Sequence, residues 1–217
     1  MRSRLAFIAT VVGLSVAVAT PGFSQAAGPK QVPVPPMEFG ILGGVNLFTF
    51  GGSDVSGAKS RTSFFAGASL NVPLSSQFYV QPEVLYSGEG GKFESAGVTD
   101  EIKIGYLRVP VLLGINLTPS ARTGVRVFAG PEVGIKLSCD LAETSGGVTQ
   151  SVSCGSQIKS FDFGVTGGAG LTFHMPRFNI TVDGRYTLGL AKVISDANVK
   201  NQGFSIGAGL SFPLRRK

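Results

Sequence analysis

The strongest indication of the fold is one stretch of thirteen residues, Gly105-Tyr106-Leu107-Arg108-Val109-Pro110-Val111-Leu112-Leu113-Gly114-Ile115-Asn116-Leu117. Its two alternating sets of residues differ in polarity. The odd positions are all apolar: Leu107, Val109, Val111, Leu113, Ile115 and Leu117. The even positions are mixed and include Arg108, Pro110 and Asn116. A period of two is typical of a β-strand whose faces meet different surroundings. The stretch therefore predicts a strand with one hydrocarbon face and, behind it, a face that holds a charge.

Seven further segments alternate in the same way, and none of the chain after the first residues shows a helical period. We expect strands at about 37–50, 61–74, 78–89, 102–117, 124–138, 158–173, 177–190 and 202–214. Each is longer than the roughly 9–11 residues that a tilted strand needs to cross a bilayer. In hydrocarbon a sheet must close on itself to satisfy its backbone. The sequence thus predicts an all-β fold, an eight-stranded antiparallel up-and-down transmembrane β-barrel over residues 37–217.

The predicted connections alternate strictly between long and short. The long ones are 51–60, 90–101, 139–157 and 191–201, and the short ones are 75–77, 118–123 and 174–176. Because neighbouring strands are antiparallel, all long loops fall at one end of the barrel. Outer-membrane barrels have short periplasmic turns and long external loops. We therefore expect the bacterial outer membrane, with long extracellular loops and both termini in the periplasm.

The first residues carry the features of an exported protein. Residues 1–26 combine a basic start, a short apolar run and small residues at their end, which predicts a signal peptide cleaved after Ala26. Residues 27–36 are proline-rich and are expected to form an extended periplasmic leader. Removing Arg2 and Arg4 lowers the formal charge from +6 to +4 (6 − 2), a mild excess that gives no reason to expect nucleic acid as a partner.

The orientation of the two faces separates a membrane barrel from a soluble, lipocalin-like barrel, which also alternates. The mixed face is rich in glycine, which suits a crowded interior. Its charges are expected to be four of each sign, paired inside the lumen, with Arg108 roughly opposite Glu132 across the 118–123 turn. The expected lumen charge network is Glu83, Arg108, Arg126, Glu132, Lys136, Asp162, Asp183 and Arg185.

Aromatic residues of the apolar face gather at the predicted strand ends. The set near the short turns is Phe39, Phe78, Phe173, Phe178 and Phe212, and the set near the long loops is Phe64, Tyr86, Phe161, Phe163, Tyr186 and Phe204. Aliphatic residues lie between the two sets. Two aromatic girdles around an aliphatic belt are typical of a barrel that crosses both membrane interfaces.

The residues that could carry chemistry are few. Cys139 and Cys154 lie in one predicted external loop, where an oxidising compartment favours a disulfide; free thiols are the alternative. Two cysteines with no nearby histidine make no zinc site, and we expect no metal and no cofactor. His174 is the only histidine and lies in a short turn, so a histidine-dependent catalytic site is not expected. The glycine-rich run 164–170 lacks the Lys-Ser/Thr ending of a phosphate-binding loop.

Four stretches resemble the porin-family outer-membrane β-barrel domain, a group that includes PorT-like proteins. They are residues 81–87, residues 106–113, Ala129-Gly130-Pro131, and Asp162-Phe163-Gly164 followed by Gly168-Ala169-Gly170. The resemblance implies an outer-membrane barrel from about residue 37 onward. Two departures matter: the family commonly has an acid where this chain has Arg108, and five residues follow Phe212, where many such barrels end on an aromatic residue.

The leading functional hypothesis is a barrel with a side-chain-filled lumen and a structural or surface-interaction role, because eight strands leave room for little more than side chains. A narrow channel for small solutes or ions is the alternative, and a membrane-embedded enzyme is a weaker one. The expected partners are outer-membrane lipid and lipopolysaccharide, the barrel insertion machinery and an extracellular ligand of the loops.

Overall fold

The computed structural model describes residues 33–95, 97–154, 158–193 and 197–214. In this part of the chain there are nine strands: β1 (Glu38–Gly51), β2 (Lys59–Pro73), β3 (Phe78–Ser95), β4 (Val98–Asn116), β5 (Thr123–Ser145), β6 (Val148–Ser153), β7 (Phe161–His174), β8 (Asn179–Gly189) and β9 (Lys200–Pro213). The predicted signal peptide and most of the predicted leader lie outside the described residues. No helix among the described residues has the length and apolar character needed to cross a membrane.

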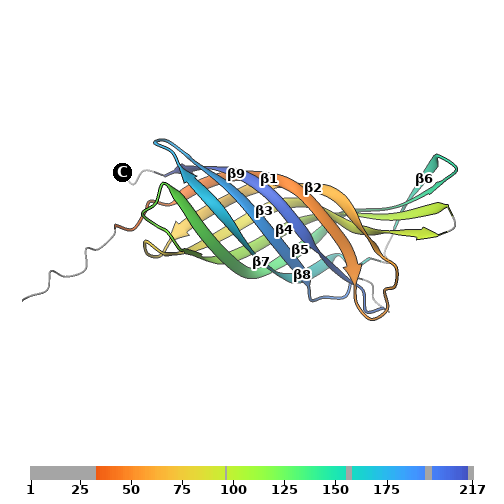
Figure 1. Ribbon diagram of the computed structural model, residues 1–217. Coiled ribbons are helices and arrows are strands. Elements are labelled where there is room, and N and C mark those ends of the chain that lie inside the picture. Colours follow the sequence, from red (N-terminus) through yellow and green to blue (C-terminus); the bar gives the residue numbers. More distant parts are fainter. Residues whose placement is uncertain (1–32, 96, 155–157, 194–196, 215–217) are drawn as a thin grey trace, which may run out of the picture. The chain divides into compact units, whose positions relative to one another are not determined.

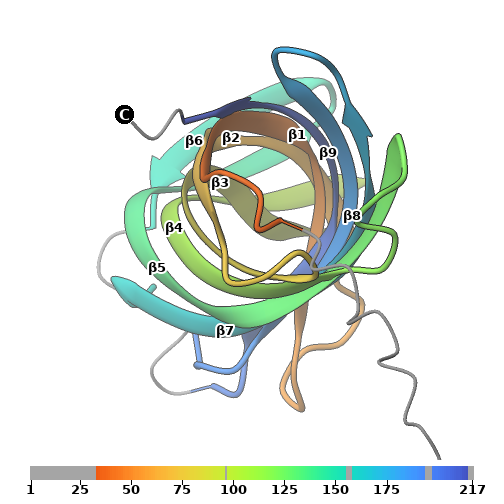
Figure 2. The same ribbon diagram turned by 90° about the vertical axis from the view of Figure 1, so that its left-hand side faces the viewer.

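Eight of the strands close into a ring, so the predicted eight-stranded antiparallel barrel is confirmed. The ring runs β1-β2-β3-β4-β5-β7-β8-β9 and closes where β9 pairs antiparallel with β1, with Phe39 opposite Phe212. Figure 2 looks along this ring from the end where β1 begins and β9 ends. We call this the turn end, since the connections after β2, β4 and β7 lie there, and the opposite end the loop end.

The alternation of the opening stretch corresponds to outside and inside. On β4, Leu113 is 57% exposed on the outer wall whereas its neighbour Leu112 is 1% exposed in the lumen. Arg108 and Tyr106 share the inward face of Leu112 and are 2% and 0% exposed. The apolar side chains therefore face outward and the charge faces inward, which is the reverse of a soluble barrel.

The outward aromatic residues form contacts between neighbouring strands at both ends of the barrel. At the loop end, Tyr186 lies 4.7 Å from Phe204 between ring centres. At the turn end, the rings of Phe178 and Phe212 lie 6.4 Å apart. Between them the outer wall is aliphatic, for example at Val111 and Val133. This is the arrangement expected of two girdles and a hydrocarbon belt.

The prediction of long loops is wrong in two places: residues 90–95 and 98–101 and much of 139–157 are strand. β3 continues to Ser95, which pairs with Val98 at the start of β4, and β5 continues to Ser145 before it turns into β6. Gly146 and Gly147 have φ of +58° and +82° at this second turn. Consecutive left-handed residues are what a two-residue hairpin needs. Figure 1 shows both hairpins extending past the ring at the loop end.

Pro110 of the opening stretch lies near two other prolines. Pro82, Pro110 and Pro131 lie on the neighbouring strands β3, β4 and β5. The β4–β5 pairing passes from Pro110–Glu132 to Leu113–Ala129, and the β3–β4 pairing from Pro82–Val111 to Leu85–Arg108. Because proline supplies no ladder donor, grouping the three confines the lost hydrogen bonds to one place.

The close approach of β4 and β5 near these prolines requires glycine at position 130. A Cβ on Gly130 would lie 2.0 Å from the Val111 carbonyl oxygen, a backbone atom that cannot move aside. We expect Gly130→Ala to lower the free energy of unfolding by about 1–3 kcal/mol, the usual cost of overpacking. Gly184→Ala is the matched control, since a Cβ there meets nothing within 4 Å. Urea unfolding of both variants in lipid vesicles, followed by circular dichroism, measures the difference, and equal stabilities would contradict the expectation.

Candidate functional site: the charged lumen and the protruding sheet

The loop-end half of the lumen holds one guanidinium among three carboxylates. Arg108 donates from Nε and Nη2 to the two carboxylate oxygens of Glu89, at 2.8 and 2.5 Å, and from Nη2 to Asp162, at 2.6 Å. Its Nη1 lies 3.4 Å from Glu132. The guanidinium also lies 4.6 Å above the Tyr106 ring. We call these four charged residues the Arg108 cluster.

The turn-end half of the lumen holds two guanidiniums and two carboxylates, which we call the Arg126–Arg185 cluster. Arg126 binds Asp183 through two hydrogen bonds of 3.0 and 2.5 Å. Arg185 binds Glu83 at 2.6 and 3.1 Å and reaches Asp183 at 3.3 Å. The Phe128 ring lies between the two guanidiniums, 5.6 and 5.3 Å from them. All charges of this cluster are thus paired across the lumen.

The structure brings seven of the eight expected lumen residues together and changes their partners. Lys136 is only half-buried, and its ammonium donates to the Ile158 carbonyl above the Arg108 cluster. Glu132 is near Arg108, as the turn suggested, but the hydrogen bonds of Arg108 go to Glu89 and Asp162. Glu89 was missed, although it has the parity of Glu83 on the same strand and is 1% exposed.

The expected balance of four positive and four negative lumen charges is therefore wrong for the buried set. The buried ionisable residues of the described chain are five acids (Glu83, Glu89, Glu132, Asp162 and Asp183) and three arginines (Arg108, Arg126 and Arg185). With all eight charged, the formal excess would be two negative charges (5 − 3), in the Arg108 cluster. The expected and observed sets differ because Lys136, which was expected to be buried, is only half-buried, whereas Glu89, which was not expected, is buried.

An apolar cluster seals the lumen at the loop end. Its buried members come from the strand ends and from the connections between them: Phe50, Ile104, Tyr106, Cys139, Ile158, Val193 and Val199. Below them, the rings of Phe65 and Phe128 lie 5.9 and 5.3 Å from the Arg185 guanidinium.

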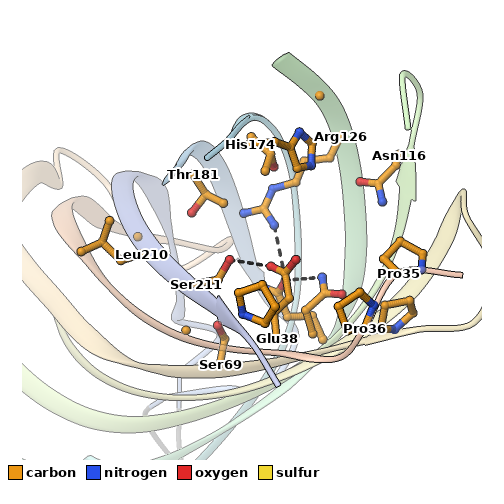
Figure 3. A pocket seen from close by; sticks show the side chains of 18 of the residues that line it. Pro35, Pro36, Glu38, Ser69, Asn116, Arg126, His174, Thr181, Leu210 and Ser211 are labelled. Carbon is orange, nitrogen blue, oxygen red and sulfur yellow. Dashed lines mark hydrogen bonds between the residues drawn. The ribbon is translucent and has the colours of Figure 1, made fainter. Parts of the chain in front are cut away.

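The turn end of the lumen is open and forms a vestibule of about 280 Å³. Figure 3 shows Arg126 and Glu38 reaching into it, with Pro35 and Pro36 along one wall. Glu38 accepts hydrogen bonds from Asn179, at 2.7 Å, and Ser211, at 2.5 Å. His174 lines the rim and is exposed, with Nδ1 3.3 Å from the Arg122 carbonyl oxygen. Among the described residues no group of three or more His, Cys, Asp or Glu is arranged to hold a metal ion.

At the loop end, the extended parts of β3, β4 and β5 together with β6 form a sheet that stands beyond the ring. We call residues 92–95, 98–103 and 139–153 the protruding sheet. A disulfide joins Cys139 of β5 to Cys154 just after β6, with Cα atoms 5.4 Å apart. This bond fixes the base of the β5–β6 hairpin against the apolar seal, where Cys139 is buried.

The other two connections at the loop end are tied to each other. The Asp54 carboxylate accepts hydrogen bonds from the Asn198 backbone N–H, at 2.7 Å, and from the Ser53 hydroxyl, at 2.8 Å. The Asn198 hydrogen bond, followed by that of Ser53, lowers the pKa of Asp54, because both stabilise the charged carboxylate. The β1–β2 and β8–β9 connections therefore lie side by side over the ring.

Loss of the disulfide is expected to loosen the protruding sheet and leave the ring intact. Among the described strands β6 pairs only with β5, so its attachment to the barrel depends on one ladder of backbone hydrogen bonds and on the Cys139–Cys154 bond. We expect the double variant Cys139→Ser, Cys154→Ser to be cleaved by protease between residues 139 and 154 at least tenfold faster than the wild type, or roughly 1.4 kcal/mol of local opening. The heat-modifiable migration of the folded barrel on gels should be unchanged. Equal cleavage rates would show that the bond contributes nothing to the hairpin.

A family model described as "Outer membrane protein beta-barrel domain" matches residues 23–195, which include β1 to β8. None of the curated proteins searched matches the chain.

Three solved structures illustrate the likeness of fold. Ail, the attachment invasion locus protein of Yersinia pestis, is 17% identical with a TM-score of 0.44, over 82% of this chain and 99% of that one. Neisserial surface protein A is 12% identical with a TM-score of 0.47, over 80% and 97%. OprG from Pseudomonas aeruginosa is 15% identical with a TM-score of 0.47, over 83% and 98%. At these identities the likeness concerns the fold alone.

Proposed function

The chain belongs to the family of outer membrane protein beta-barrel domains, and from this premise we propose that it is a closed, non-enzymatic barrel that presents the protruding sheet to molecules outside the cell. Its place is the bacterial outer membrane. The loop end would be extracellular and the turn end periplasmic, since outer-membrane barrels keep their short turns inside. The signal peptide would be removed on export, and the partners would be lipid, lipopolysaccharide and the insertion machinery.

The observation that carries this proposal is the apolar face of the protruding sheet. Leu141 and Val152 lie opposite each other across β5 and β6, and Ile102 lies opposite Leu141 on β4. Val148 and Val152 share this face and are 65% and 62% exposed, although they lie beyond the ring. Gln150 stands between them, opposite Glu143, so the apolar side chains of this face flank a polar pair. Exposed apolar side chains grouped on one face are typical of interaction surfaces. Exposed apolar side chains on the outer wall of the ring would contact lipid, whereas those of the protruding sheet lie beyond the ring and require another contact.

Adhesion of whole cells tests the surface role. Cells that display the wild-type chain are expected to bind at least one of a panel of immobilised serum and matrix proteins above the level of cells without it. Val148→Asn with Val152→Asn should remove this binding, because it makes the apolar face polar. Ser151→Asn is the matched control, since Ser151 alternates with them and points to the opposite face of β6. Equal binding by all three chains would contradict the proposal.

Orientation is tested by labelling introduced cysteines on intact cells with a membrane-impermeant maleimide. Cysteines at the exposed positions Ser56 or Lys192, in loop-end connections, are expected to react, whereas a cysteine at the exposed Gln77, in the β2–β3 turn, should react only after the cells are opened. Reversed labelling would place the turn end outside and would overturn the surface role.

The channel alternative is tested by electrical recording in planar bilayers. The apolar seal and the two buried charge clusters support a closed lumen, so we expect no discrete openings at any applied voltage. Stepwise conductance by the refolded protein would favour a narrow channel instead.

A further inference from the structure

A small cavity lies in the lumen between the two charge clusters. Its volume is about 30 Å³, and Arg108, Glu132 and Arg185 all line it. Three buried atoms of these side chains, Arg108 Nη1, Glu132 Oε1 and Arg185 Nε, have no hydrogen-bond partner among the described residues. The side chains are only 3%, 6% and 6% exposed, so bulk solvent does not serve them. Buried polar groups are nearly always hydrogen-bonded, and three exceptions around one cavity call for a ligand there.

We propose that this cavity binds one ordered water molecule, which accepts hydrogen bonds from Arg108 Nη1 and Arg185 Nε and donates one to Glu132 Oε1. A cavity of roughly 10–15 Å³ already holds one water, and buried waters typically make about three hydrogen bonds. The site therefore offers enough room for a water and the usual number of partners. Two donors and one acceptor match the two lone pairs and one of the two hydrogens of water.

The chemistry of the walls disfavours ions of either sign. A cation would lie against the guanidinium N–H groups of both arginines, each of which carries a positive charge. An anion would lie against the carboxyl group of Glu132, in a lumen whose buried ionisable residues already number five acids to three arginines. A neutral molecule that can both donate and accept satisfies all three atoms. The volume excludes anything as large as a sugar or an amino acid.

The proposed water would join the two charge clusters into one network. Glu132 belongs to the Arg108 cluster through a contact of 3.4 Å that is not a hydrogen bond, and Arg185 belongs to the other cluster. A water between them would give Glu132 a hydrogen-bonded partner and would link β4, β5 and β8 across the lumen. Such bridges are almost as favourable as direct hydrogen bonds.

Oxygen-17 magnetic relaxation dispersion, which counts long-lived internal waters, tests the proposal on the refolded full barrel. Glu132→Leu removes the acceptor and fills space, so we expect one long-lived water fewer than in the wild type. Glu132→Gln is the matched control, because its amide oxygen still accepts, and its count should equal that of the wild type. Equal counts in the wild type and in Glu132→Leu would overturn the proposal.

A crystal structure of the wild-type barrel, at a resolution that shows ordered water, keeps the proposal testable if Glu132→Leu does not fold. We expect one isolated density peak within hydrogen-bond distance of Arg108 Nη1, Arg185 Nε and Glu132 Oε1. An empty cavity, or a peak with the contacts of a bound ion, would overturn the proposal.

Discussion

Arg108→Met is expected to lower the free energy of unfolding by about 3–5 kcal/mol, the usual cost of removing one partner from a buried ion pair. Methionine keeps an unbranched, mostly aliphatic side chain but removes the only guanidinium of the Arg108 cluster. Glu89 and Asp162, each 1% exposed at the side chain, would lose their charge partner and its short hydrogen bonds. Urea unfolding in lipid vesicles, followed by circular dichroism, measures the loss.

Two further variants separate the loss of the charge partner from a general effect of substitution. Arg122→Met, at an exposed position in the β4–β5 turn, should change the stability by no more than about 0.5 kcal/mol. Combining Arg108→Met with Glu89→Gln and Asp162→Asn removes two of the three uncompensated carboxylates, those hydrogen-bonded to Arg108, and should restore part of the lost stability. An Arg108→Met barrel as stable as the wild type would show that the cluster does not hold the lumen together.

Val111→Arg is expected to destabilise the barrel by about 2–4 kcal/mol, because it places a cation at the middle of the hydrocarbon belt. The register of β3 and β4 places residue 111 midway between the two aromatic girdles. Tyr86 of the loop-end girdle pairs with Leu107, and Phe78 of the turn-end girdle pairs with Ile115. Val111 is 44% exposed on the outer wall, so the arginine would have no steric conflict. The penalty would come from lipid alone.

Leu117→Arg provides the matched control for depth. Leu117 is also apolar and outward, at 54% exposure, but it lies just past the turn-end girdle, where an arginine costs only about 0–1 kcal/mol. Urea unfolding of the two variants in phospholipid vesicles compares them directly. Equal effects at the two depths would mean that the outer wall does not lie in a membrane.

The sequence predicted the eight strands of the ring and the orientation of their faces because both depend on a local period of two. Leu112 and Leu113 are identical residues, and parity alone assigned one to the lumen and the other to the outer wall. The aromatic girdles followed from the same rule. Glu89 could have been found by it too, since it has the parity of Glu83.

The partners within the lumen could not be predicted from parity. Arg108 on β4 binds Asp162 on β7, and Arg185 on β8 binds Glu83 on β3, so both pairs span the barrel between strands that are not neighbours. Such contacts depend on the tilt and stagger of the strands in the closed ring. The sequence of a single strand does not determine either quantity. The β5–β6 hairpin was missed for another reason: the turn signal Gly146-Gly147 was present, but the polar composition around it was read as loop.

Spin labels placed one by one on residues 107–117 would show whether the hydrocarbon face of the barrel lies in lipid and the charged face in a closed lumen. Labels at the outward positions Val109, Val111, Leu113 and Ile115 should be accessible to oxygen, which dissolves in lipid, and not to a water-soluble nickel complex. Labels at Leu112 and Gly114 should be accessible to neither reagent. Access of the nickel complex to the odd positions would contradict the account.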